Sequence, residues 1–146
     1  MTRPGTAPAK RDLRPTARRI ALSAAALVFL GIAVGSTFSP HYTARAFDYV
    51  LSTPDALSEY RAIYTGLFIA HVLVLGWAAW RVDLLYLGDA AAILILGQVA
   101  GRVLSAFVDG MPTGNVVFIG AVELAGAVAI AATRPRRPPP DRPTAS

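Results

Sequence analysis

The fold is decided by residues 62–108, AIYTGLFIAHVLVLGWAAWRVDLLYLGDAAAILILGQVAGRVLSAFV, in which two apolar runs flank the polar connection Arg81–Asp83. The run over residues 62–80 would be about 29 Å long as a helix, which matches a bilayer core of about 30 Å. A connection this short places the two helices side by side as a hairpin. The segment therefore predicts two neighbouring transmembrane helices.

Two further apolar runs extend this pattern in both directions along the chain. The four predicted helices cover residues 20–38, 62–80, 84–108 and 114–132. Pro40, Pro54 and Pro112 fall in the connections, where a missing backbone N–H costs little. We therefore predict an all-α fold, an integral membrane protein built as an antiparallel four-helix transmembrane bundle over residues 20–132.

The two ends of the chain differ in composition from this middle part. Residues 1–19 and 133–146 combine proline with arginine, a composition typical of disordered tails. A cleaved signal peptide is the alternative interpretation of the first run, with a small-residue site at Ala44–Ala46. The basic leader and the apolar run are both longer than such signals usually have, which favours a retained helix.

Charge predicts the orientation of the bundle. The formal net charge is +5, and the basic residues gather in the two tails, with Arg81 in the middle connection. An even number of spans puts all of these on one side, and loops rich in Lys and Arg face the cytoplasm. Arginine and alanine richness is typical of GC-rich bacterial genomes. We expect a bacterial cytoplasmic (inner) membrane, with the N- and C-termini cytoplasmic.

Composition also excludes several classes of function. The chain has no cysteine and only two histidines, so we expect no metal site, and no nucleotide or hydrolase motif predicts a cofactor. The basic tails carry no interleaved aromatic residues, which argues against nucleic acid as a partner. Membrane lipids are the expected surroundings.

Polar side chains inside the apolar runs are the candidates for a functional site, because charge in hydrocarbon is costly. Gln98, Arg102, Ser105 and Asp109 recur at a helical period and predict one polar stripe facing inward. The remaining members of the predicted polar cluster come from the second run, the segment just before it and the fourth run. They are Glu59, Arg61, Tyr64, His71 and Glu123.

Arg102 and Glu123 come out at similar depths, about 9 Å and about 13 Å from the outer end of their helices. This match predicts an ion pair between the third and fourth helices. The pair has two interpretations, which the sequence leaves open. It either joins the helices as internal structure, or it belongs to a polar pocket that holds a ligand or moves a proton.

Small residues four apart indicate where helices approach closely. Gly31 and Gly35 form such a pair in the first run, and Gly97 and Gly101 form another in the third. Either pair is a candidate face for a homo-oligomer.

Two motifs carry a resemblance to a known family. They are Glu59–Leu67, EYRAIYTGL, and the segment from Gly101 to Pro112, in which Gly101-Arg102, Ser105 and Asp109-Gly110 stand before Pro112. Over about residues 55–133 the chain resembles a family of small bacterial membrane proteins known as the domain of unknown function 4345.

The resemblance implies a four-helix membrane fold in which five polar residues belong together. Those residues are Glu59, Arg61, Arg102, Asp109 and Glu123. Thr65 stands where the family tends to have glycine, and the resemblance brings no activity with it.

Three functions are compatible with these residues. The favoured one is a non-enzymatic membrane protein that binds a lipophilic ligand or another membrane protein through the polar cluster. The second is an isomerase- or cyclase-type enzyme in which Glu123 is the acid/base and Arg102 stabilises charge, with His71 as a further catalytic candidate. The third is a small oligomeric transporter or proton conductor.

Overall fold

The structure, a computed structural model, describes residues 13–112 and 114–135. Within these ranges every secondary-structure element is a helix. In chain order these are α1 (Arg14–Phe38), α2 (Pro40–Arg45), α3 (Pro54–Arg61), the π-helix η1 (Ala62–Leu67), α4 (Phe68–Trp80), α5 (Leu85–Val108) and α6 (Asn115–Ala132). Four spans are long and apolar enough to cross a membrane: α1, the continuous Pro54–Trp80, α5 and α6. The prediction of an all-helical chain with four such spans is confirmed.

The first span starts earlier than the sequence predicted. Helix α1 begins at Arg14, so residues 14–19, expected in the disordered tail, are helical. Pro15 lies in the first turn, where a helix loses no hydrogen bond to proline. The physical reason for the extra turn is Arg18, whose side chain is buried against other helices instead of lying in water. Residues 1–12 and 136–146 of the predicted tails lie outside the described residues.

The second span also starts earlier, at Pro54 instead of residue 62. Thr53 is its N-cap, and the Thr53 hydroxyl accepts a hydrogen bond of 3.1 Å from the Ala56 N–H. Pro54 follows at the first helical position, and Asp55 places a negative charge in the first turn, where the helix dipole favours it. These local signals extend the helix beyond the apolar run.

The helices pack in two pairs, α1 with α4 and α5 with α6. On α1 the buried positions follow a helical stripe, listed as Arg18, Leu22, Ala26, Phe29, Ala33 and Ser36. The partner faces of α4, α5 and α6 are rich in buried alanine. Small side chains let the backbones approach closely where lipid supplies no hydrophobic drive between helices.

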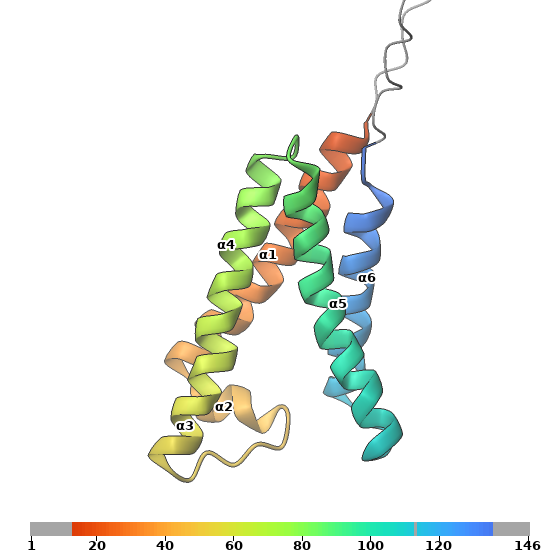
Figure 1. Cartoon of the computed structure of the whole chain (residues 1–146). Helices are drawn as coiled ribbons and strands as arrows, with labels where there is room; N and C mark the ends of the chain where they lie inside the picture. Colours follow the sequence, from red (N-terminus) through yellow and green to blue (C-terminus); the bar gives the residue numbers. More distant parts are fainter. Residues whose placement is uncertain (1–12, 113, 136–146) are drawn as a thin grey trace, which may run out of the picture.

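The two pairs meet at one end and separate toward the other (Figure 1). The turn between α4 and α5 is tied by Arg81, which donates two hydrogen bonds to Asp83 and so holds the pKa of that carboxyl below its usual value. All buried residues of α5 lie in its first half, from Gly88 to Ile95. The second half of α5 therefore leaves α4, and this divergence creates the space for a site.

The two ends of the bundle are distinguished below by a residue found at each. At the Asp89 end, the start of α1 and the end of α6 meet the first turns of α5, through Arg18 and Arg134. At the Tyr60 end lie α2, the following loop and α3, and the Asn115 amide donates to the Ala46 carbonyl at 3.4 Å.

Candidate functional site

The predicted ion pair between α5 and α6 is present. Arg102 Nε donates to Glu123 Oε2 at 2.9 Å, and Arg102 Nη2 donates to Glu123 Oε1 at 3.0 Å. This two-point geometry is the strongest form of an arginine–carboxylate contact. Glu123 is 7% exposed at its side chain and Arg102 is 27% exposed, so the carboxylate is enclosed while the guanidinium reaches an open space.

Gly120 makes this approach possible. It lies three residues before Glu123 on α6, and a Cβ placed there would lie 3.2 Å from Arg102 Cδ. The stem of Arg102 therefore crosses α6 where a side chain is missing. The pair is set by the backbone of both helices and not only by attraction between charges.

A second polar contact joins α4 to α5. His71 Nδ1 lies 2.8 Å from the Leu67 carbonyl oxygen, and His71 Nε2 lies 3.2 Å from Gln98 Nε2. A carbonyl only accepts, so Nδ1 carries the proton and Nε2 accepts from the Gln98 amide. His71 is buried and its ring stacks on Phe29 at 4.9 Å. His71 is thus fully engaged by its neighbours.

Aromatic rings continue from His71 toward the Tyr60 end. Tyr64 stacks on Tyr60 with 4.5 Å between ring centroids and contacts Phe68 at 5.4 Å. The Tyr64 hydroxyl donates to the Tyr49 hydroxyl at 3.3 Å. Tyr64 and His71 therefore share one face of the second span, where both contact Phe68.

The site opens into a groove of about 360 Å³ where α5 leaves α4, which we call the Arg102 groove. Its polar lining comes from Tyr49, Tyr64, Gln98, Arg102 and Ser105. Its apolar lining comes from Ile63, Leu67, Phe68, Gly101, Pro112 and Val116. Within residues 13–112 and 114–135, Arg102 Nη1 makes no hydrogen bond, so this residue of the groove lining keeps one donor available.

Comparison with known proteins assigns the chain to a family. The family model described as domain of unknown function (DUF4345) matches residues 17–133, most of the chain. The chain belongs to this family. No curated protein and no solved structure matches the chain. The resemblance inferred from the two motifs is confirmed, and the DUF4345 match adds the first helix, which those motifs did not cover.

Not every polar residue predicted for the cluster reaches the groove of this DUF4345 chain. The expected inward stripe on α5 ends early: Ser105 is exposed at the groove rim, and its hydroxyl donates to the exposed Asp109 at 2.9 Å. Glu59 and Arg61 are exposed at the end of α3, and neither forms an ion pair with another described residue. The stripe turns outward because the second half of α5 has no helix packed against that face.

Sequence reasoning missed a second ionic cluster at the Asp89 end, in which Arg18 and Asp89 lie inside the DUF4345 region and Arg134 directly follows it. Arg18 is 1% exposed, and its Nη2 lies 2.8 Å from Asp89 Oδ1. It also donates to the carbonyls of Leu85 at 3.0 Å and Ile130 at 3.2 Å. Arg134 contacts the other oxygen of Asp89 at 2.9 Å. Asp89, the only acidic residue within the apolar runs at that end, was the available signal.

The groove holds no cluster suited to a metal ion. Across the described ranges, no three His, Asp or Glu side chains gather as a ligand group. What the arrangement offers is hydrogen bonding next to aromatic walls.

Proposed function

We propose that this protein is an integral membrane protein that binds a lipophilic molecule in the Arg102 groove. The ligand carries a hydrogen-bond acceptor, such as a carbonyl or an ester, at its polar end. The observation that carries the proposal is that Arg102 lines the groove and keeps its Nη1 donor unused among the described residues, while Glu123 fixes Nε and Nη2.

The lining supports a mostly apolar ligand with a small polar head. The volume, about 360 Å³, is within the range of small-molecule sites. Because Glu123 already balances the charge of Arg102, a neutral acceptor suits the groove better than a free anion. The rings of Tyr64 and Phe68 provide flat apolar walls beside the guanidinium.

The π-helix η1 gives independent support. Single π-helical turns inside longer helices occur frequently at functional sites. Three residues of η1, namely Ile63, Tyr64 and Leu67, line the Arg102 groove. The irregular turn thus coincides with the groove.

Binding is favoured over catalysis by the state of Glu123. Both of its oxygens accept hydrogen bonds from Arg102, and the residue is 8% exposed. An acid/base residue has to reach the substrate proton with a free oxygen. Isomerase or cyclase chemistry therefore ranks second.

A transporter or proton conductor ranks below both. It needs a polar path through the whole bundle. At the Asp89 end the one acidic group of the spans, Asp89, is already held by Arg18 and Arg134.

The predicted cytoplasmic membrane, the cytoplasmic termini and a homo-oligomer stay predictions. Gly97 has open space around its Cβ position, whereas Thr43 fills the space at Gly35.

Native mass spectrometry of the full-length protein in detergent tests the proposal. Gly101→Leu adds a side chain to the groove lining, and its Cβ is accommodated because a Cβ at Gly101 meets no atom within 4 Å. Gly97→Leu is the matched control, one helical turn away, equally open and outside the groove lining. We expect a defined co-purifying mass in wild type and Gly97→Leu that is at least tenfold depleted in Gly101→Leu. Equal occupancy in both variants would refute the groove as the binding site.

A further inference from the structure

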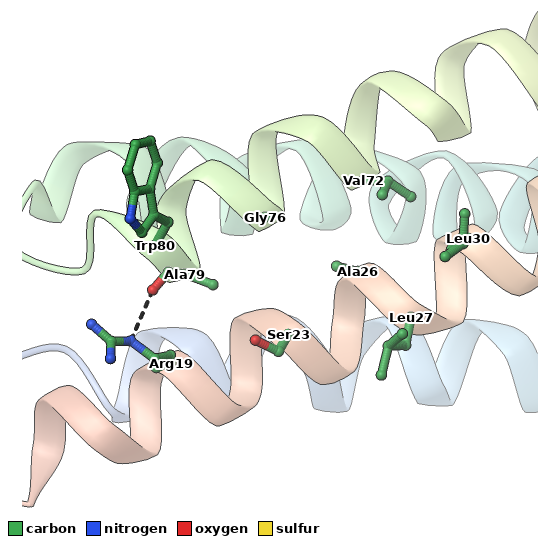
Figure 2. Close-up of a pocket in the computed structure, with 9 residues that line it drawn as sticks. All are labelled: Arg19, Ser23, Ala26, Leu27, Leu30, Val72, Gly76, Ala79 and Trp80. Carbon is green, nitrogen blue, oxygen red and sulfur yellow. Dashed lines mark hydrogen bonds between the residues drawn. The ribbon is translucent and has the colours of Figure 1, made fainter.

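A second groove lies between α1 and α4 at the Asp89 end, away from the Arg102 groove (Figure 2). Its volume is about 730 Å³. One end is polar, with Arg19, Ser23 and Trp80, and the rest is lined by apolar side chains that include Leu27, Leu30 and Val72. We call it the Arg19 groove.

Arg19 is held in place without being neutralised. Its Nε donates to the Ala79 carbonyl at 3.0 Å, in the last turn of α4, where helix carbonyls lack partners within the helix. Figure 2 shows this bond, which holds the guanidinium at the end of α4 that carries Trp80. Within residues 13–112 and 114–135, no carboxylate lies within 4.0 Å of Arg19.

The neighbouring arginines of this end differ from Arg19. Arg18 and Arg134 share Asp89, and Arg81 is paired with Asp83. The carboxylates of Asp89 and Asp83 are therefore already paired with other arginines and do not neutralise Arg19. The two Nη groups of Arg19 keep their full charge and their donors at the polar end of the groove.

We propose that the Arg19 groove binds an anionic phospholipid. The phosphate accepts from the Nη groups of Arg19, with the Ser23 hydroxyl and the Trp80 indole N–H as further donors within the lining. One acyl chain follows the apolar lining past Gly76. Arginine and tryptophan at a membrane interface attract anionic head groups and anchor the helix there. The proposal rests on the helices spanning a bilayer and is independent of a ligand in the Arg102 groove.

Quenching of Trp80 fluorescence by brominated lipid measures this contact. The sequence has two tryptophans, so Trp77→Phe leaves Trp80 alone. The protein is placed in vesicles of equal parts phosphatidylglycerol and phosphatidylcholine, with bromine on one lipid at a time. We expect phosphatidylglycerol to be preferred about fivefold, the effect of one well-placed cationic residue.

Matched variants separate a site from general surface charge. Arg19→Gln should bring the preference to about one, while Arg81→Gln, which removes the same charge outside the groove, should keep it. Gly76→Leu should abolish the preference as well, because a Cβ there meets no atom within 4 Å and the larger side chain enters the groove. Gly97→Leu, outside the lining of the Arg19 groove, is the control for Gly76→Leu.

Three results would overturn the proposal. One is equal quenching by the two lipids, and another is an equal loss of preference in Arg19→Gln and Arg81→Gln. The third concerns the source of the phosphate: loss of the preference when inorganic phosphate is added at constant ionic strength would show that the groove recognises free phosphate and not lipid.

Discussion

Arg18 and Arg102 place a guanidinium between apolar helices in different ways. Arg18 is 1% exposed and its donors reach one carboxylate and two backbone carbonyls. Arg102 lines the groove, gives two donors to Glu123 and leaves Nη1 without a partner among the described residues. A buried charge is tolerated when its donors are satisfied. Arg18, whose donors are satisfied, is therefore structural. Arg102, which has a remaining donor, is the candidate for ligand recognition.

Gly88 gives a test of the Arg18 contacts. Alanine in place of glycine inside a helix usually stabilises by up to about 1 kcal/mol. At Gly88 a Cβ would collide with the Arg18 guanidinium, which is fixed by several hydrogen bonds and cannot move without losing them. We expect Gly88→Ala to lower the free energy of unfolding by about 2 kcal/mol.

Thermal or denaturant unfolding in detergent measures this effect. Gly97→Ala is the control, because a Cβ at Gly97 meets no atom within 4 Å, and it should be neutral or slightly stabilising. A Gly88→Ala variant as stable as wild type would contradict the packing described for Arg18.

The sequence predicted one of these two ionic contacts and missed the other. Arg102 is the one basic residue of the third apolar run and Glu123 the one charged residue of the fourth, and their similar depths predicted that they pair. Arg18 stands among Arg14 and Arg19, in a segment whose charges also fit an orientation signal. Only the packing of α1 decides which arginine of that segment turns inward.

The sequence did not predict the π-helix η1, just as it did not predict the short helices α2 and α3 in the expected connection, where Pro40 and Pro54 take the first helical positions. The run from Ala62 to Leu67 has the composition of an ordinary apolar helix. The wider turn changes the rotation of α3 relative to α4. Tyr60, 4% exposed, then reaches Thr43 with a hydrogen bond of 3.0 Å. A π-turn arises from such tertiary contacts, which local propensity does not contain.

Deletion of Ala62 tests the role of this turn. We expect an uninterrupted α-helix in which α3 is rotated by about 100°, which moves Tyr60 out of its buried place. Tyr60→Ala should cost about 3 kcal/mol in the wild-type chain and little more in the deletion background. The measurement is the free energy of unfolding of the four proteins, with helicity as a control. Additive losses would show that Tyr60 keeps its place without the π-turn.

At the scale of the whole molecule, the four spans form two pairs that share one end and separate at the other (Figure 1). The count of spans was predictable, because apolar length and the absence of internal proline are local properties. The pairing of α1 with α4, and the divergence of α5 from α4, were not. The pairing and the divergence depend on which small residues face each other across two helices. Because alanine occurs on every face, its positions in the sequence do not indicate which faces pack together.

The predicted orientation can be tested with single cysteines, since the chain contains none of its own. Ser52 lies in the exposed loop at the Tyr60 end and Asp83 in the exposed turn at the Asp89 end. With cytoplasmic termini, a membrane-impermeant maleimide should label Ser52→Cys in intact cells and label Asp83→Cys only after permeabilisation. The reverse pattern would refute the predicted orientation.

The contacts of Arg18 also bear on how the chain is assembled. During synthesis α1 emerges first, but the acceptors of Arg18 belong to Leu85, Asp89 and Ile130. A nascent chain that ends before α6 already contains Leu85 and Asp89 but still lacks the Ile130 carbonyl, one of the three acceptors of Arg18. Synthesis of α6 therefore completes the set of acceptors, and the first helix reaches its final environment only after α6 has been made.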